Sequence, residues 1–287
     1  MSRQDDANWP RASHWLLPDD GANADVAVFG VPAHSTSIST TGADKTPAAI
    51  REALQRYSLH SSSGDLAGLV ARDFGDIQDP DNNEDATSAM ATKLTATAQL
   101  TVAIGGDNSI TFAVAKQLQG GLITFDAHHD IREGKSNGSP VRRLIEEAGF
   151  DPKRIVQLGI NDFSNSPEYT RRAKEWGITV ITREDLARRS AEDVIAEALE
   201  IAGPNTHVDF DVDVCDRAFV PACPASAPGG ISAFELRTFA NLVTRSKNVR
   251  SMDITEIDAT ADAPDQRTIR LGALLILEAS KGALARA

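Results

Sequence analysis

Short apolar runs rich in valine and isoleucine alternate along this chain with longer stretches in which apolar residues recur at helical spacing. Unbroken apolar runs of this length are typical of strands that are buried on both faces of a sheet. The expected strands are Asp25–Val31, Leu100–Gly106, Leu122–His128, Arg154–Ile160, Gly177–Thr182, His207–Val214 and Val249–Ile257. The expected helices are Pro47–Arg56, Glu84–Gln99, Pro140–Ala148, Pro167–Trp176, Arg183–Ala202, Ala233–Arg245 and Gln266–Ala285.

Three of these helices are preceded by a residue suited to capping the first turn. Thr46 precedes Pro47, Ser166 precedes Pro167, and Ser232 precedes the helix that begins at residue 233. A hydroxyl at the N-cap accepts a hydrogen bond from an unpaired backbone N–H, and proline suits the first helical position because it has no N–H. We therefore expect Thr46, Ser166 and Ser232 to cap their helices.

The alternation of strands and helices predicts a single α/β domain over residues 1–287, with a mostly parallel sheet covered by helices on both faces. No linker rich in glycine, serine or proline divides the chain, and no repeat is visible. Residues 1–22 are expected to be an irregular N-terminal segment, and Asp76–Asp85 a solvated acidic loop. In open sheets of this kind ligands bind beyond the carboxyl ends of the strands, so we look for a site there.

Composition and charge narrow the classes of function. The 287 residues are 41% hydrophobic, enough for a substantial core. The net charge of −12 argues against nonspecific binding to nucleic acid, which needs a basic surface. No apolar run approaches the roughly 20 residues that a membrane-spanning helix needs.

The two cysteines, Cys215 and Cys223, lie in one segment, and the N-terminus is too polar and acidic for an export signal. We expect free thiols and a cytoplasmic location, because disulfides are rare in reducing compartments.

Residues of the types that bind metal ions follow the expected strands. Asp126 and His128 are two positions apart, so on an extended segment they would share a face, and the same holds for Asp211 and Asp213. Apolar residues flank both pairs, and buried carboxylates need cations nearby. Either pair alone is a weak signal, but two such pairs at strand ends of one α/β chain indicate a metal site.

The donor types also indicate which metal the site would bind. Oxygen-rich ligation with a single imidazole suits Mn²⁺ better than a tetrahedral zinc site. Two such ions could share bridging carboxylates and activate one water molecule.

Four segments, GGDNS, DAHHD, DFDVDVCDRAFVPACPASAPGG and MDITEID, resemble the signature segments of the ureohydrolase family, which includes arginase and agmatinase. Residues 30–54 resemble the family's N-terminal segment, and the order and spacing of the motifs match over about residues 25–280. The resemblance implies a three-layer α/β/α fold, a binuclear manganese site, and hydrolysis of a C–N bond at a guanidino or amidino carbon.

The resemblance also implies a ligand set: Asp126, His128, Asp130, Asp211, Asp213 and Asn108. Asp126 and Asp211 would bridge the two manganese ions. His128 and Asp213 would complete one ion, and the remaining two residues would complete the other.

The chain departs from the family at two positions of this motif set. Asn108 stands where most of the family has a histidine, and Asn137 stands where arginases and agmatinases have another. An amide oxygen is a weaker ligand for Mn²⁺; alternatively, the amide holds a water molecule that reaches the metal. In both cases we expect the ion shared by Asp130 and Asn108 to bind less tightly and to be lost first to a chelator.

The details are similar to one subgroup of the family, the formimidoylglutamases of histidine degradation. The similar segments are GGDNS, DAHHDIRE, NGSPVRRL, GINDFSNSPEY and ACPASAPGG. The implied reaction is the hydrolysis of N-formimidoyl-L-glutamate to L-glutamate and formamide. Asp130 would pass a proton to the leaving nitrogen. Glu256 would accept hydrogen bonds from the formimino nitrogen, or is instead a structural carboxylate.

A physical argument favours a substrate with carboxylates. Arg132 lies two residues beyond Asp130 and is therefore expected at the rim of the metal cleft. An arginine there would bind a dicarboxylate and would repel the ammonium group of agmatine.

Asn137, Arg142 and, less strongly, Arg143 are further candidates for substrate contact, because they follow in the same segment. The alternative is that the arginines of this segment pair with surface acids such as Glu133 and Glu146.

Two other functions stay open at this level. One is a family member that releases urea from agmatine or a guanidino acid. The other is a non-catalytic relative that has lost a metal through Asn108 and Asn137. The resemblance implies a homo-oligomer, a trimer or a hexamer. The roles of Asp107, Asp209 and Asp216 are not determined by the sequence.

Overall fold

A nine-stranded sheet forms the centre of the computed structural model, which describes residue 6 and residues 8–286. The strand order is β1-β5-β2-β6-β11-β10-β7-β8-β9, and all pairings in this sheet are parallel. The strands are β1 (Leu16–Pro18), β2 (Val26–Val31), β5 (Ala71–Asp76), β6 (Leu100–Gly105), β7 (Leu122–Phe125), β8 (Ile155–Ile160), β9 (Thr179–Thr182), β10 (Thr206–Asp211) and β11 (Val249–Thr255). A separate antiparallel pair joins β3 (His60–Ser61) and β4 (Gly64–Asp65).

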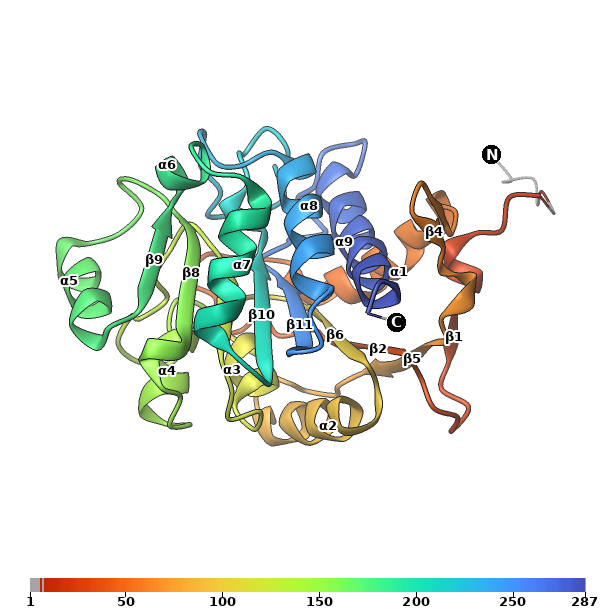
Figure 1. The fold of residues 1–287 in the computed structure, drawn as a ribbon, viewed down its shortest axis with the longest axis horizontal. Coiled ribbons are helices and arrows are strands. Elements are labelled where there is room, and N and C mark those ends of the chain that lie inside the picture. The colour runs from red at the N-terminus through yellow and green to blue at the C-terminus, as the bar shows by residue number, and fades with distance from the viewer. Residues whose placement is uncertain (1–5, 7, 287) are drawn as a thin grey trace.

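Helices cover both faces of the sheet, which confirms the expected α/β/α arrangement (Figure 1). One layer contains α1, α7, α8 and α9, with α8 packed between α7 and α9. The other contains α2, α3, α4 and α5. The helices are α1 (Thr46–Ala53), α2 (Glu84–Thr97), α3 (Ile110–Ala115), α4 (Pro140–Glu146), α5 (Pro167–Trp176), α6 (Arg183–Leu186), α7 (Ala191–Ala202), α8 (Ala233–Thr244) and α9 (Arg267–Leu284). The 3₁₀ turns are η1 (Ala12–His14), η2 (Ala43–Lys45), η3 (Leu54–Arg56), η4 (Leu66–Gly68), η5 (Pro152–Arg154) and η6 (Val212–Val214).

The largest hydrophobic core lies between the sheet and the layer of α1, α7, α8 and α9. The aromatic rings of Phe125 on β7 and Phe210 on β10 are stacked there, with centroids 4.8 Å apart. Side chains of neighbouring strands lie side by side in a parallel sheet, so this packing holds β7 and β10 in register. The carboxyl ends of these two strands carry the candidate metal ligands.

Two of the three expected helix caps are confirmed. Ser166 accepts a hydrogen bond from Tyr169 N, and Ser232 forms a capping box with Glu235. The expectation for Thr46 is wrong, because α1 begins at Thr46 itself and Lys45 occupies the N-cap. The buried Thr46 hydroxyl instead donates to the carbonyl oxygen of Ile257, a contact between distant segments that the local pattern does not encode.

The stretch Arg183–Ala202, expected as one helix, is two. Thr182 and Asp185 form a capping box at the start of α6. Ser190 then accepts a hydrogen bond from Asp193 N and begins α7. Two capping serine or threonine residues within one apolar-periodic stretch therefore divide it.

The N-terminal segment is more regular than expected. Within residues 1–22, η1 and the edge strand β1 are ordered, and β1 pairs with β5. The indole N–H of Trp15 donates to the carbonyl oxygen of Leu69 and fixes this edge. Neither β1, β5 nor α3 was expected, since strands this short or polar and a six-residue helix lack a clear periodic signal.

Two further features concern the cysteines and the hydropathy of the helices. Cys215 and Cys223 are free and buried. Among the residues that the structure describes, no helix combines the length and hydropathy needed to cross a bilayer.

Candidate metal centre and cleft

The candidate ligands and Glu256 meet at the carboxyl ends of four adjacent strands, β6, β11, β10 and β7. A cleft of about 250 Å³ opens there. It is lined by Ile38, Ser39, His128, Asp130, Ile131, Arg132, Asn137, Gly138, Ser164, Asn165, Ser166, Tyr169, Asp211, Asp213, Ala225 and Glu256. The position is the one expected for a ligand site in an open parallel sheet.

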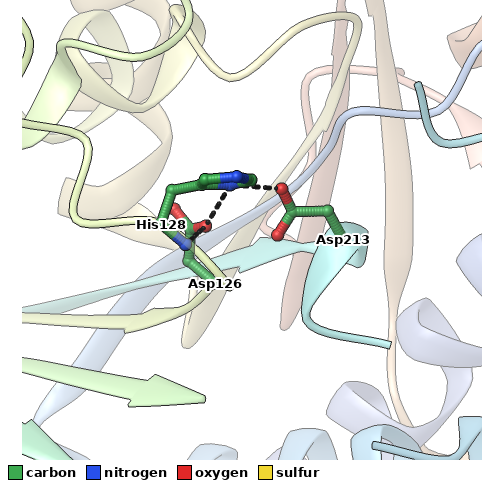
Figure 2. A group of neighbouring side chains, drawn as sticks. All are labelled: Asp126, His128 and Asp213. Carbon is green, nitrogen blue, oxygen red and sulfur yellow. Dashed lines mark hydrogen bonds and ion pairs between the residues drawn. The ribbon is translucent and has the colours of Figure 1, made fainter. Parts of the chain in front are cut away.

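Five of the six expected ligand residues form two overlapping groups. Asp126, His128 and Asp213 make one group, shown in Figure 2, and Asp126, Asp130 and Asp211 make the other. Within each group, one ligand atom per residue lies within 4.8 Å of the others. Asp126 is common to both groups, so its position is that of a residue able to bridge two ions.

Local turns orient the side chains of these ligands. The expectation that Asp126–His128 and Asp211–Asp213 are extended is therefore wrong. β7 ends at Phe125, before Asp126, and β10 ends at Asp211, where η6 begins. Oδ1 of Asp126 accepts from His128 N at 2.6 Å, and Oδ1 of Asp211 accepts from Asp213 N at 2.9 Å. Each carboxylate thus closes a turn that brings the residue two positions later to the same site.

A further hydrogen bond ties the two turns together. Oδ1 of Asp213 accepts from Ala127 N at 2.9 Å, and Oδ2 of Asp213 lies 2.7 Å from Nδ1 of His128. The loops after β7 and β10 are therefore held against each other by ligand side chains.

Burial and mutual repulsion set the protonation of the cluster. Burial, with the neighbouring Asp213, raises the pKa of Asp126 to about 7. Burial also raises the pKa values of Asp130 and Asp211, and neighbouring carboxylates add to the shift. Burial opposes the protonation of His128, but Asp213 and Asp126 raise its pKa to about 12. The raised carboxyl pKa values mean that holding all of these carboxylates ionised together is unfavourable unless a cation is nearby.

The residues fit divalent metal ions. Oδ2 of Asp126 is buried and has no hydrogen-bond partner in the described part of the chain, although buried carboxylate oxygens are normally paired. A cation would supply the missing partner and compensate the clustered charge. Four carboxylates with one imidazole are hard donors of the kind that Mn²⁺ prefers.

Asn108 differs from the arrangement expected of a ligand. Its Nδ2 donates to Oδ2 of Asp130 at 2.8 Å, and its Oδ1 accepts from the Thr111 hydroxyl at 2.6 Å. The opposite amide orientation would set two oxygens against each other at Asp130. Asn108 therefore presents its amide nitrogen to the cluster and orients the Asp130 carboxylate, while its oxygen faces α3.

Glu256 and Asn137 form a linked pair in the cleft. Oε1 of Glu256 accepts from the backbone N–H of Asn108 at 2.7 Å and from Nδ2 of Asn137 at 2.9 Å. Oδ1 of Asn137 accepts from Ile38 N, which fixes the amide orientation. Glu256 has a φ of +63°, and Asp130 has a φ of +51°. Such values are uncommon for these residues, and conformational strain of this kind concentrates at functional sites.

The arginines of the loop between β7 and α4 have different environments. Arg132 lines the cleft, and its guanidinium has no ion pair or hydrogen bond to any residue that the structure describes. Its side chain runs over Gly138, where a Cβ atom would come within 2.8 Å of Cδ of Arg132. The two acids considered as partners are engaged elsewhere: Glu133 with Arg172, and Glu146 with Arg142.

Arg142 and Arg143 do not line the cleft. Arg142 is buried and donates to the carbonyl oxygens of Arg132 and Gly134 as well as to Glu146. These contacts place Arg142 behind the loop that carries Arg132, where it holds the loop rather than facing a ligand. Arg143 pairs with Glu84 and Glu147.

The motif reasoning missed several residues of the loop after β8. Ser164, Asn165, Ser166 and Tyr169 line the cleft. Asn165 also accepts from His129 N and donates to the Ala127 carbonyl, so it braces the ligand-bearing turn. All four lie in the segment GINDFSNSPEY, whose similarity to the formimidoylglutamases was the sequence signal that could have identified them.

Residues left open by the sequence have structural partners. His129 is buried, with Nδ1 2.7 Å from Oε1 of Gln157. Asp107 accepts from the backbone and hydroxyl of Ser109, and Asp216 accepts from the N–H groups of Ala218 and Gly229. Asp209 accepts from the Thr255 hydroxyl at 3.4 Å.

Comparison with known proteins agrees with the fold and shows the family. The model of the arginase family matches residues 24–281. The formimidoylglutamase of Halalkalibacterium halodurans is 35% identical, over 96% of this chain and 93% of that protein. The crystal structure of formimidoylglutamase from Bacillus subtilis has a TM-score of 0.91 and 30% identity, covering 98% of this chain and 94% of that one. Formiminoglutamase of Trypanosoma cruzi with Mn²⁺ has the same fold, with a TM-score of 0.89 and 24% identity over 97% of this chain and all of that one.

Proposed function

This chain belongs to the arginase family, and from that premise we propose that it hydrolyses N-formimidoyl-L-glutamate to L-glutamate and formamide. The formimidoylglutamases of Halalkalibacterium halodurans and Bacillus subtilis support this substrate, since each aligns over nearly its whole length. The enzyme is a hydrolase acting on the C–N bond of a linear amidine, and histidine degradation is the pathway that fits it.

The unpaired guanidinium of Arg132 carries the assignment of the substrate class. A glutamate derivative brings two carboxylates into a cleft whose other charged residues are mostly acids, so it needs a free cation at the rim. Arg132 is the arginine that lines the cleft among the residues described. Agmatine, with an ammonium group at the corresponding end, would be repelled by it.

The residues that would hold Mn²⁺ are Asp126, His128, Asp130, Asp211 and Asp213. When bound, such ions lower the pKa of a coordinated water toward neutrality and so supply the nucleophile. Asn108 would hold Asp130 through its amide, which leaves the second oxygen of that carboxylate free to bind.

The side chains of the cleft account for the proton transfers of the reaction. Water adds to the formimino carbon, the bond from that carbon to the glutamate nitrogen breaks, and formamide leaves with the former imino nitrogen. Asp130 accepts the proton that the attacking water loses and passes it to the departing glutamate nitrogen. Glu256 accepts hydrogen bonds from the protonated formimino nitrogen, since Asn108 and Asn137 occupy only its Oε1.

We propose two Mn²⁺ ions per subunit, of which the one beside Asp130 and Asn108 binds more weakly because it has one protein ligand fewer. A calorimetric titration of metal-free protein with MnCl₂ should therefore resolve two steps of different affinity. In Asn108→His, an imidazole restores a sixth ligand and the two steps should draw together. If the unaltered protein instead bound two Mn²⁺ ions in a single step with equal affinity, the proposed difference in affinity would be contradicted.

Arg132→Ala is expected to raise the KM for N-formimidoyl-L-glutamate about 10- to 100-fold, the range for losing a hydrogen bond to a charged group. Metal content should stay unchanged, because Arg132 contacts no ligand residue through its side chain. Arg188→Ala is the matched control, because Arg188 is exposed and its one ion pair within the described part of the chain is with Glu184. An unaltered KM in Arg132→Ala would reject the contact.

The test of the function is a substrate comparison with Mn-loaded protein. N-formimidoyl-L-glutamate, agmatine, arginine and guanidinobutyrate are offered separately, and glutamate, formamide and urea are measured. Formamide and glutamate in equal amounts are expected from the first substrate. Urea from a guanidino substrate without any glutamate formation would overturn the proposal in favour of a different ureohydrolase.

A non-catalytic relative is the second candidate from another class. It would be favoured by a folded protein that binds no Mn²⁺ and hydrolyses none of these substrates. The retained cluster argues against it, because four mutually repelling carboxylates destabilise a fold that makes no use of a cation.

Two further proposals concern the location and the assembly of the protein; the first rests on its free cysteines and the second on the family resemblance. We propose that the protein is cytoplasmic and that it forms a homo-oligomer, a trimer or a hexamer. Light scattering of the purified protein measures the second directly, and a monomeric mass would reject it.

A further inference from the structure

A second hollow lies at the amino ends of the strands, on the side of the sheet opposite to the cleft. Its volume is about 430 Å³. The loops that lead into β10 and β11 supply Asn205, Lys247 and Asn248, and β11 itself supplies Arg250. The rest of the wall comes from α2 and from α3 with the residues that follow it. We call this feature the basal hollow.

The basal hollow is basic in a protein of net charge −12. Lys247 is exposed and has no ion pair or hydrogen bond to any residue in the described ranges. Arg250 uses its Nη2 to bind the carbonyl oxygens of Thr95, at 2.6 Å, and Ala98, at 3.2 Å. No aspartate or glutamate is among the lining residues. Two cations therefore face the same space without a carboxylate partner.

A third cation strengthens the positive field. Arg286 donates to the carbonyl oxygens of Thr244, Gln99 and Val249. Burial and the charge of Arg250 lower the pKa of Arg286 to about 10, so the two guanidinium groups act on each other. Their repulsion is a cost that an anion would relieve.

An adjoining hollow of about 530 Å³ shares Lys247 and Arg250 and includes Arg286. Asp25 is the one acid on its wall among the residues described. The carboxylate of Asp25 already accepts from Val70 N and from Nε2 of Gln99. It is therefore directed to the backbone and to a neutral side chain, and it leaves the arginines uncompensated.

The remaining wall of the basal hollow has the character of a site for an organic molecule. The side-chain amides of Gln117, Asn205 and Asn248 line it, and none of them hydrogen-bonds to another residue that the structure describes. Ala91, Val114 and Leu118 add an apolar portion. Small-molecule sites typically combine apolar walls with a few polar groups of this kind.

We propose that the basal hollow binds a small organic anion, with its carboxylate or phosphate between Lys247 and Arg250 and its apolar part against the wall of α2 and α3. The Arg250 guanidinium is held in place by the carbonyl groups at the end of α2, so little side-chain freedom is lost when an anion binds. Its Nε and Nη1 have no partner in the described part of the chain and remain available for charge-assisted hydrogen bonds.

Calorimetric titration with phenyl phosphate and with benzoate tests the proposal, since the two probes share the ring and differ in the anionic group. Saturable binding of at least one of them is expected, and it should weaken at least about tenfold in Lys247→Ala. Lys174→Ala, which removes an exposed lysine on α5, is the matched control and should bind as the unaltered protein does.

Two further probes each lack one part of the proposed ligand: benzyl alcohol has no anionic group, and inorganic phosphate has no ring. Benzyl alcohol should not bind measurably, and inorganic phosphate should bind more weakly than phenyl phosphate. Failure of both aromatic anions to bind, or equal binding by Lys247→Ala, would overturn the site. Inorganic phosphate that binds as tightly as phenyl phosphate would overturn its assignment to an organic anion. None of these outcomes depends on the hydrolytic activity.

Discussion

Asp211→Asn is expected to reduce metal-dependent hydrolysis by more than about 100-fold, because even changes beside a metal ligand typically cost 10- to 100-fold. Asp211 stands at the end of β10 in one of the two ligand groups. Asparagine keeps its shape but removes the charge that a divalent ion needs. Bound manganese and turnover, measured on the same samples, should fall together.

Asp162→Asn is the matched control for this substitution. Asp162 is an exposed carboxylate in the loop after β8 with no partner among the described residues. It should keep full metal content and activity. An Asp211→Asn protein that still bound manganese and turned over substrate would remove Asp211 from the ligand set.

The same substitution should stabilise the metal-free protein, by about 1 kcal/mol or more, because it removes one of several repelling buried carboxyl groups. The folded pKa of Asp126 is raised from 3.8 to about 7, so the native state holds a proton that the unfolded chain releases between these values. Stability of the metal-free protein should therefore fall as the pH rises through this range. Asp211→Asn should flatten that fall, and melting temperatures in the presence of a chelator measure it.

Glu256→Gln is expected to lower kcat by about 10²- to 10³-fold, comparable to the loss of one electrostatic group that stabilises a transition state. The substitution removes the charge that faces the protonated formimino nitrogen. The amide oxygen of glutamine can still accept from the N–H of Asn108 and the amide of Asn137, so its NH2 group would face the formimino nitrogen in place of a carboxylate oxygen. Metal content should be unchanged, because Glu256 is in neither ligand group.

Three results distinguish the possible roles of Glu256. A lowered kcat with full metal content supports its contact with the substrate. Loss of manganese in Glu256→Gln would instead make it part of the metal site. An unaltered kcat would make it the structural carboxylate that the sequence left open as an alternative.

Much of the architecture follows from local patterns. The bounds expected for α5 agree with the structure, and Ser166 caps it, because an N-cap serine followed by proline acts within a single turn. The buried strands β2, β6, β8 and β11 lie where the apolar runs predict them, to within two residues at each end. The edge strand β1 and its neighbour β5 were not predicted, because β1 has only three residues and β5 is largely polar, so neither has a continuous apolar run.

The residues of the candidate metal centre were also predicted from the sequence. Asp126, His128 and Asp213 carry the charge and donor types for a cation, and their place at strand ends is a consequence of the alternating pattern. The backbone conformation of these residues was not predicted. Asp126 and Asp211 each close a turn instead of continuing a strand, because the carboxylate accepts a hydrogen bond from the N–H two residues later.

The sequence by itself determined most of the order of strands and helices, the mostly parallel sheet, and the candidate donor residues at the carboxyl ends of its strands, because each depends on periodicity and residue type along the chain. Only the tertiary structure decided that Asn108 turns its nitrogen to Asp130, and that Arg132 is free while Arg142 is bound to the loop carbonyls. These outcomes depend on which partners reach each side chain. Glu256 is 148 positions from the backbone N–H of Asn108 that orients it, a distance over which local propensity carries no information.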